Sequence, residues 1–369
     1  MSARPFREAR VSIEAIAHNV RELRRLAPAR HLMAVVKADG YGHGAVTAAR
    51  AALEAGADHL GVADVAEALE LRRAGIDAPL LAWLHDPAAD FAAATQAGIA
   101  LGVSSLEQLE RAAAAGHRPA VHVKVDTGLS RNGVVEADWG PLVERLVALV
   151  DAGDVRLEGV FSHLSNTDAD EDRAQIVAFE RFLGAVDSVG LDPGIRHLAA
   201  SGAALDLPAA RYDMVRAGIA LYGIAPAPHH RDLPLRPAME LSAAIAAVKR
   251  VPAGSGVSYG YLHRTTGTTT LALVPLGYAD GAPRHALGAP VLINGAIFPV
   301  AGRIAMDQFV VDVGDHSVAV GDRAVLFGDP STGAPSADEW AEAAGTIGYE
   351  IVTRLGRRVT KTAVRSHRA

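Results

Sequence analysis

The chain has 369 residues, of which half are hydrophobic and 21% are charged, so it is long enough for two domains with a full core. Its net charge of -6 argues against a nucleic-acid partner or an anionic membrane surface, since either needs a basic face. It contains no cysteine, which excludes disulfides, thiolate metal sites and cysteine nucleophiles and is compatible with a reducing cytosol.

The N-terminal part predicts an amphipathic helix, because apolar residues recur at helical spacing from Ile13 to Leu26 with arginines between them. No uninterrupted apolar core precedes a cleavage site, and Glu8, Glu14 and Glu22 argue against an organellar transit peptide. No other apolar run is long and uncharged enough to cross a bilayer. We therefore expect no membrane association and a cytoplasmic location.

Residues 31–36 form an apolar run typical of a strand buried on both faces, and Lys37 follows it directly. Burial at the end of a dry strand disfavours the charged amine, so Lys37 is a candidate nucleophile for Schiff-base formation with a carbonyl. The alternative is a lysine that extends to solvent. Gly40, Gly42 and Gly44 favour the first interpretation, because glycines allow the backbone to approach a ligand closely.

Short apolar runs alternate with helical stretches from residue 32 to about 223, and eight strand-helix units can be counted. The clearest helix is expected at 170–189. This succession favours an α/β fold with a (β/α)8 TIM-type barrel over an open doubly wound sheet, which stays the alternative. We expect the barrel to occupy residues 10–232. Its predicted strands cover 32–37, 59–63, 80–84, 101–103, 120–126, 157–162, 196–199 and 214–216.

A barrel of this type carries its chemistry at the carboxyl ends of the strands. Ser201, Gly202, Gly218 and Ile219 follow the last two strands, where hydroxyl and backbone N–H groups commonly bind phosphate. A histidine near the mouth is able to stack on an aromatic cofactor, although alone it fits a core histidine equally well. Together these groups describe a pocket for pyridoxal 5'-phosphate. The candidates at this mouth are Lys37, Arg131, His163, Ser201, Arg216 and Gly218.

Beyond residue 228 the composition changes. Residues 229–237 are rich in proline and charge and indicate a linker. Short alternating apolar runs with turn residues between them follow, and these are typical of β-strands. We therefore expect a smaller, mostly-β C-terminal domain at 233–369. Its predicted strands cover 241–251, 268–276, 290–293, 296–300, 308–313 and 324–327.

Several motifs resemble the alanine racemase family, which depends on pyridoxal phosphate. They occur in family order along almost the whole chain, and an ordered series is far more specific than one motif. The motifs are AVVKADGYGHG at 34–44, KVDTGLSRNG at 124–133, VRAGIALYG at 215–223, GVSYG at 256–260, LGYADG at 276–281 and GRIAMDQ at 302–308.

The resemblance implies roles for individual residues. Lys37 holds the cofactor as an internal aldimine, and Arg216 faces the pyridine nitrogen. Tyr41 and Tyr349 bind the phosphate with Ser201, Gly218 and Ile219, and His163 lies beside the ring. Arg131 and Met306 contact the substrate. Lys124 matches a lysine that is often carbamylated in the family.

The resemblance also implies two-base chemistry that interconverts L-alanine and D-alanine. Inverting the α-carbon needs a base on each face, and these bases match Lys37 and Tyr259. A phenol is a weak base at neutral pH, so we expect an arginine or histidine beside Tyr259. The family forms a homodimer in which the C-terminal domain, with residues 1–9 packed on it, covers the barrel mouth of the second subunit. The implied role is to supply D-alanine for peptidoglycan.

Other classes of protein fit this sequence less well. GVSYG also fits the nucleophile elbow of a serine hydrolase, but that elbow needs a helix directly after it, and residues 261–266 are weakly helical. The fifteen histidines lack a ligand spacing, so we expect no metal. A barrel amino-acid decarboxylase would need a cysteine in the second domain. A cofactor-binding protein without catalysis would not need Tyr259.

Overall fold

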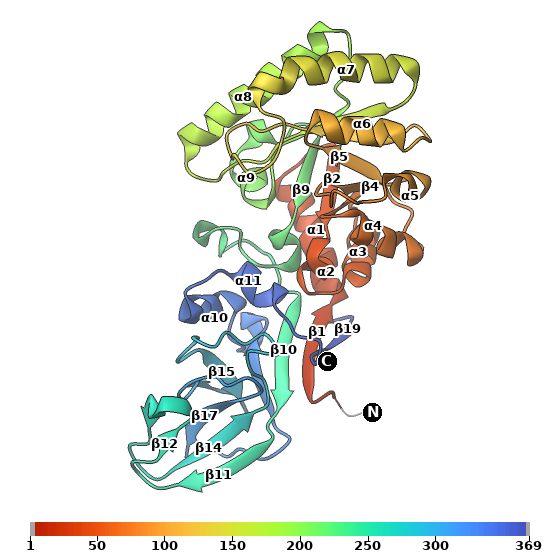
Figure 1. The fold of residues 1–369 in the computed structure, drawn as a ribbon. Helices are drawn as coiled ribbons and strands as arrows, with labels where there is room; N and C mark the ends of the chain where they lie inside the picture. The colour runs from red at the N-terminus through yellow and green to blue at the C-terminus, as the bar shows by residue number, and fades with distance from the viewer. Residues whose placement is uncertain (1–3, 367–369) are drawn as a thin grey trace.

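The computed structural model describes residues 4–366. Figure 1 shows an elongated molecule with a helix-covered barrel at one end and a mostly-β part at the other. Both ends of the described chain lie near the junction, where strands β1 and β19 pair side by side. The predicted α/β class, with a barrel followed by a smaller β domain, is confirmed. The domain limits at 232 and 233 stay a prediction.

The barrel consists of eight parallel strands in the order β8-β7-β6-β5-β4-β3-β2-β9. An isolated parallel bridge between Ala200 and Arg216 and the hydrogen bond from Arg216 N to Ala199 O (3.1 Å) join its two ends. The sheet is therefore closed, and the open-sheet alternative is wrong. The strands are β2 (His31–Val35), β3 (His59–Val62), β4 (Leu80–Ala82), β5 (Ala100–Val103), β6 (Ala120–Lys124), β7 (Arg156–Phe161), β8 (Ile195–His197) and β9 (Met214–Ala217).

These strands match the predicted ones because most are buried along nearly their whole length and so read as unbroken apolar runs. Several predicted strands extended a few residues too far at the carboxyl end, where the chain leaves the ladder to form the barrel mouth.

Some of the barrel helices begin at side chains that accept hydrogen bonds from the first turn. Ser12, Asp64, Asp90, Ser105 and Asp168 cap five of them in this way. The predicted helix at 170–189 is found one residue earlier. The helices are α1 (Ile13–Leu26), α2 (Lys37–Tyr41), α3 (Ala45–Glu54), α4 (Val65–Arg73), α5 (Phe91–Gln96), α6 (Leu106–Ala114), α7 (Trp139–Ala152), α8 (Ala169–Ser188) and α9 (Ser201–Asp206). None of the helices within residues 4–366 is both long and apolar enough to cross a bilayer.

The C-terminal part contains a six-stranded sheet in the order β16-β15-β18-β10-β1-β19 and a three-stranded sheet in the order β11-β14-β17. Two helices, α10 (Ala337–Ala344) and α11 (Gly348–Thr353), lie between these sheets and the barrel. The strands are β10 (Met239–Ala244), β11 (Ala247–Val251), β12 (Gly256–Val257), β13 (His263–Arg264), β14 (Thr269–Val274), β15 (Pro290–Ile293), β16 (Ala296–Pro299), β17 (Phe309–Gly314), β18 (Arg323–Phe327) and β19 (Thr360–Val364).

The N-terminal segment joins the C-terminal sheet. Strand β1 (Arg7–Ser12) pairs antiparallel with β10 and parallel with β19. Of the residues 1–9 expected to pack on the second domain, 1–3 lie outside the described residues. Because β1 runs directly into α1, the C-terminal sheet is tied to the first helix of the barrel.

Candidate active site

A cavity of about 720 Å³ opens at the carboxyl ends of the barrel strands, which is within the usual size of a ligand site. It brings together residues that are far apart in the sequence. Tyr349 reaches it from α11 of the C-terminal part. Of the predicted site residues, the cavity is lined by Lys37, Tyr41, Lys124, Arg131, His163, Ser201, Arg216, Gly218, Ile219 and Tyr349.

Lys37 opens the short helix α2, immediately after β2. Burial lowers the pKa of its amine, and the nearby charge of Arg131 lowers it further. At a given pH, a larger fraction of this amine is therefore neutral, and so nucleophilic, than in a solvated lysine.

Trp83, which the sequence analysis missed, lines the cavity beside this amine. Lys37 Nζ lies 5.9 Å from the centroid of the Trp83 ring. Two glycines provide the space for the indole, because a Cβ on Gly61 would lie 2.6 Å from Trp83 Cζ3 and one on Gly102 would lie 2.9 Å from Trp83 Cβ. Trp83 lay inside the strand predicted at 80–84, but β4 ends at Ala82, so the indole belongs to the barrel mouth.

Three hydroxyls around Gly218, those of Ser201, Tyr41 and Tyr349, form a cradle that fits a phosphate. The Gly218 N–H donates to Ser201 Oγ (2.9 Å), which leaves the Ser201 hydroxyl hydrogen free to donate elsewhere. A Cβ on Gly218 would lie 2.7 Å from Tyr41 Oη, so only glycine leaves this space open. Burial raises the pKa of Tyr41 and raises that of Tyr349 to about 12. Both phenols therefore stay protonated at neutral pH as hydrogen-bond donors, and donors are what a phosphate requires.

Arg216 is buried in the barrel wall, and burial lowers its pKa to about 10, so it keeps its charge at neutral pH. Its Nη2 donates to the backbone oxygens of Ser162 and Leu198, both at 2.8 Å. Nη1 lies 3.2 Å from His197 Nδ1, and Nη2 lies 3.2 Å from His163 Nδ1. Nη1 has two hydrogens, one for His197 O at 2.9 Å and one for His197 Nδ1, so this imidazole accepts through Nδ1. The two carbonyls already take both hydrogens of Nη2.

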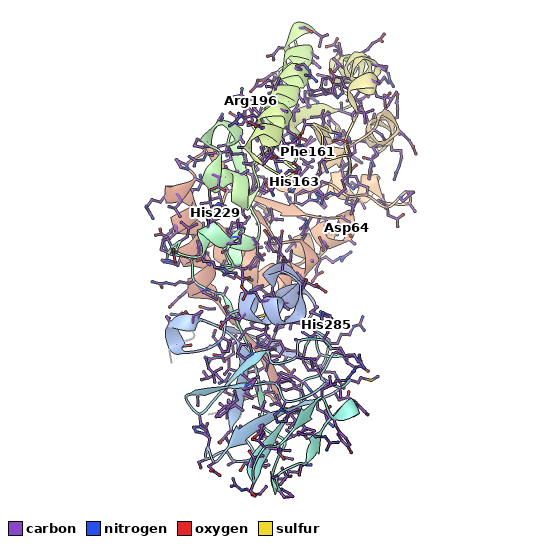
Figure 2. All side chains as sticks on the ribbon, turned by 90° about the vertical axis from the view of Figure 1, so that its left-hand side faces the viewer. Asp64, Phe161, His163, Arg196, His229 and His285 are labelled. Carbon is purple, nitrogen blue, oxygen red and sulfur yellow. The ribbon has the colours of Figure 1, made fainter. Side chains whose placement is uncertain are left out.

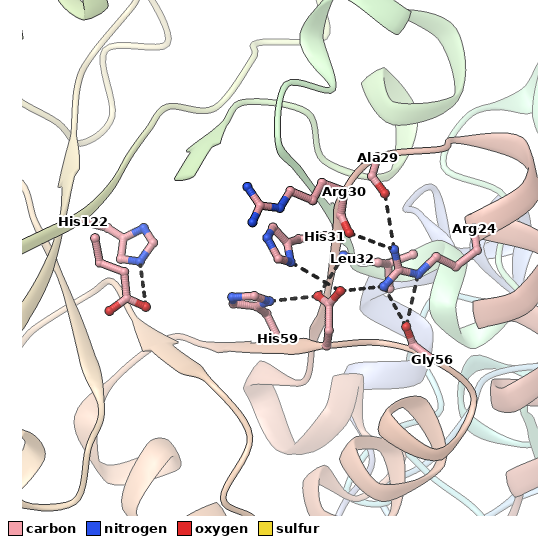
Figure 3. Close-up of polar contacts among 10 residues, drawn as sticks. Arg24, Ala29, Arg30, His31, Leu32, Gly56, His59 and His122 are labelled. Atoms are coloured by element: carbon pink, nitrogen blue, oxygen red, sulfur yellow. Dashed lines mark hydrogen bonds and ion pairs between the residues drawn. The ribbon is translucent and has the colours of Figure 1, made fainter. Parts of the chain in front are cut away.

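The acceptor role of His197 Nδ1 also determines which nitrogens of His197 and His122 carry protons. His197 must carry its proton on Nε2, which lies 3.0 Å from His122 Nδ1. His122 must then carry its own proton on Nε2, which points toward Glu158 Oε1 at 3.9 Å (Figure 3). Burial lowers the pKa of both imidazoles, so both are neutral. This chain of donors from Arg216 to Glu158 orients the guanidinium, and neither His197 nor His122 was predicted from the sequence.

Phe161 packs between the cationic groups of the cavity. Its ring centroid lies 5.8 Å from Lys124 Nζ and 5.9 Å from Arg216 Cζ, and its ring stacks on His197 at 4.8 Å. Figure 2 shows Phe161 and His163 within the barrel, above the segment that carries His229. Burial, together with the charges of the arginines, lowers the pKa of Lys124 to about 8.

Tyr259 and Met306 do not line this cavity. They lie in the C-terminal part with 71% and 54% of their surfaces exposed. A Cβ on Gly260, the residue after Tyr259, would lie 3.6 Å from Arg303 Nε, so an arginine lies beside this segment. Within the described chain, Tyr259 and Met306 therefore lie apart from the residues that line the cavity.

Comparison with known proteins decides the family. The family profile described as "Alanine racemase, N-terminal domain" matches residues 11–226, and the profile described as "Alanine racemase, C-terminal domain" matches residues 238–363. The alanine racemase of Thermobifida fusca is 51% identical over 96% of this chain and 97% of that protein. The alanine racemase of Salinispora tropica is 50% identical over 95% of each. The chain belongs to the alanine racemase family.

Solved structures of alanine racemases agree with this assignment. The enzyme from a D-cycloserine-producing Streptomyces lavendulae superposes with a TM-score of 0.96 at 47% identity, covering 98% of both chains. That of Bacillus anthracis with bound L-Ala-P gives a TM-score of 0.89 at 34% identity, covering 99% of this chain and 97% of the other. The protein is accordingly an amino-acid racemase, which is an isomerase.

Membership of the alanine racemase family also decides against the serine hydrolase. Ser258, at the centre of the GVSYG motif, donates its hydroxyl to Arg303 O at 2.6 Å. A single 3-10 turn (Tyr259–Tyr261) and the short strand β13 follow it, in place of the helix that a nucleophile elbow needs.

Two clusters of histidine and aspartate lie outside the cavity residues discussed so far. At the opposite end of the barrel, Asp58 accepts hydrogen bonds from His59 Nδ1 (2.8 Å), Leu32 N (3.0 Å) and Arg24 Nη2 (2.7 Å), and His31 lies 3.4 Å away (Figure 3). With its oxygens already taken by an arginine and a backbone N–H, this carboxylate is better explained as a structural acceptor than as a metal ligand.

The second cluster lies at the rim of the cavity. Asp206 accepts hydrogen bonds from His229 Nε2 (3.0 Å) and His230 Nε2 (2.8 Å). A metal on His230 Nε2 would move its proton to Nδ1, which is buried without a partner in the structure. The expectation of no metal in this racemase stays a prediction.

Proposed function

We propose that this chain interconverts L-alanine and D-alanine with pyridoxal 5'-phosphate bound covalently at Lys37. The observation that carries the proposal is a single cavity that contains a lysine amine of lowered pKa, a phosphate cradle and a buried arginine. When bound, the cofactor withdraws electrons from the substrate α-carbon and so acidifies its hydrogen.

The residues of the cavity have distinct roles in holding the cofactor. Tyr41, Ser201 and Tyr349 donate their hydroxyls to the phosphate, and the backbone at Gly218 and Ile219 completes the cradle. His163 packs against the ring. Arg216 faces the ring nitrogen, and because its guanidinium only donates, that nitrogen stays an unprotonated acceptor.

Arg131 and Lys124 act at the substrate end of the cavity. Arg131 binds the substrate carboxylate as a fixed donor. Lys124 carries a carbamate beside it, since an amine whose pKa is about 8 is partly neutral at physiological pH and is able to add carbon dioxide.

Two bases of different type exchange the proton. Lys37 Nζ removes or delivers it on one face of the α-carbon, and the Tyr259 hydroxyl acts on the other. Tyr259 and Met306 lie outside the cavity of their own chain and are largely exposed, which supports a homodimer in which each subunit supplies them to the other. Met306 then offers its backbone amide to the substrate.

The proposed place of the reaction is the cytoplasm, where it supplies D-alanine for peptidoglycan. The absence of cysteine and the negative net charge are compatible with that setting.

The test is racemisation of L-alanine in D2O, with optical rotation and the NMR signal of the α-hydrogen followed together. Two separate bases predict that the first D-alanine formed carries deuterium, while the remaining L-alanine keeps its hydrogen. Lys37→Ala should abolish both changes, whereas Lys249→Ala, at an exposed lysine of β11, should leave them unaltered. First-formed D-alanine that retains its hydrogen, or no racemisation at all, would contradict the proposal.

A further inference from the structure

The segment that carries Lys37 has an unusual backbone. Ala38, Asp39, Gly40, Tyr41 and Gly42 have φ values of 52°, 52°, 61°, 51° and 83°, so five successive residues are left-handed. This conformation costs roughly 1–2 kcal/mol for each residue with a Cβ, and only two of the five are glycine. Contacts from outside the segment must therefore hold it in place.

One such contact comes from Glu67 in helix α4. Its Oε1 accepts the Ala38 N–H at 2.7 Å, and its Oε2 accepts the Ala63 N–H at 2.8 Å. Ala63 directly follows β3, so a single carboxylate joins the turn after β2 to the end of the neighbouring strand. The same negative charge acts on Lys37, whose pKa it raises against the larger lowering effect of burial.

A second contact comes from Asp39 within the turn. Its Oδ1 accepts the Ala45 N–H at 2.8 Å and so caps α3, and its Oδ2 pairs with Lys361 Nζ. Lys361 belongs to β19, which is an edge strand of the C-terminal sheet. The turn also packs directly on α11, since a Cβ on Gly42 would lie 2.1 Å from Val352 O.

We propose that Glu67 is a positioning residue for the Lys37 amine, and that the Asp39–Lys361 pair holds the same turn from the C-terminal sheet. The conformation of the turn thus depends on two carboxylates, one anchored in the barrel and the other anchored to β19. The inference rests on the proposed function in taking Lys37 as the lysine that binds the cofactor.

The first arm of the test measures Lys37 itself. Apoenzyme is mixed with pyridoxal 5'-phosphate at a series of pH values, the adduct is trapped with borohydride, and the Lys37 peptide is quantified by mass spectrometry. Glu67→Gln should move the midpoint of this pH profile downward, because the charge that favours the protonated amine is removed. The matched control is Glu70→Gln, at an exposed residue of the same helix, and its midpoint should equal that of the wild type.

The second arm measures the turn without cofactor. Hydrogen exchange of the apoenzyme should be about tenfold faster at the Ala38 or the Ala63 amide in Glu67→Gln, because glutamine has one acceptor oxygen for these two N–H groups. Asp39→Asn and Lys361→Met should accelerate exchange at the Ala45 amide and leave the capture midpoint unchanged. These two variants alter a half-exposed ion pair, so they are expected to retain the fold even if Glu67→Gln does not.

The two proposals fail in different ways. If wild-type apoenzyme does not capture the cofactor at Lys37, the proposed function is wrong. Hydrogen exchange at the amides of the turn then still tests the positioning role. If Glu67→Gln matches Glu70→Gln in both midpoint and exchange, or if Asp39→Asn and Lys361→Met leave exchange at Ala45 unchanged, the positioning role assigned to the altered residue is overturned.

Discussion

Replacing Ser201 with alanine should weaken the binding of pyridoxal 5'-phosphate by about ten- to a hundredfold. The Ser201 side chain is only 5% exposed and accepts the Gly218 N–H at 2.9 Å, so its own hydrogen is directed away from that bond and toward the cavity. A buried hydrogen bond to a charged group contributes about 1.5–3 kcal/mol. Since about 1.4 kcal/mol corresponds to a tenfold change in affinity, the loss amounts to one to two orders of magnitude.

The assay is an absorbance titration of apoenzyme with pyridoxal 5'-phosphate, which reports binding and does not depend on turnover. Ser188→Ala is the control, because Ser188 is an exposed residue at the end of α8 whose hydroxyl donates to its own helix. If Ser201→Ala bound the cofactor as tightly as the wild type, the assignment of the phosphate cradle would be refuted, because that assignment requires a hydrogen bond from Ser201 to the phosphate.

Three further outcomes are expected. Enzyme equilibrated with 13C-bicarbonate should show a carbamate resonance that is lost in Lys124→Met and kept in Lys249→Met; a spectrum without it would rule out the carbamate. The pKa of His163 is lowered to about 3 by burial and by Arg216, so between that pH and its unfolded value near 6.5 the unfolded state binds more protons, and stability falls as the pH drops. In urea titrations, the free energy of unfolding should fall between pH 7 and pH 5 by about 2 kcal/mol more in the wild type than in His163→Phe. Equal decreases in the two proteins would refute this. His197→Leu removes a ring acceptor of Arg216 and should lower the free energy of unfolding by about 1–3 kcal/mol, whereas a change as small as that of a surface substitution would contradict the chain of donors.

The barrel could be predicted from the sequence because its strands are buried and therefore appear as separate apolar runs. The same logic failed at residues 241–251, which were predicted as one strand. They form β10 and β11 in two different sheets, and nothing in an apolar run marks the point at which a chain changes sheets. The helices α10 and α11 were missed because short helices carry weak periodicity.

The cavity residues were found through their position after strands and through resemblance, and the contacts that hold them were not. Trp83 depends on two glycines in neighbouring strands. The His197–His122 pair joins residues 75 positions apart. Lys361 reaches Asp39 across 322 positions. Such pairings follow from the closed barrel and the returning C-terminal strand, which local sequence patterns do not encode.

The central claim is that Lys37 of one subunit and Tyr259 of its partner form each active site. Lys37→Ala and Tyr259→Phe chains, carrying different tags and inactive when purified alone, are co-expressed, and the mixed dimer is isolated. Each mixed dimer holds one native site, so a random mixture of the two chains should recover about a quarter of the wild-type racemase activity, all of it in the doubly tagged fraction. Activity that stays at the level of the separate variants would contradict a site shared between subunits.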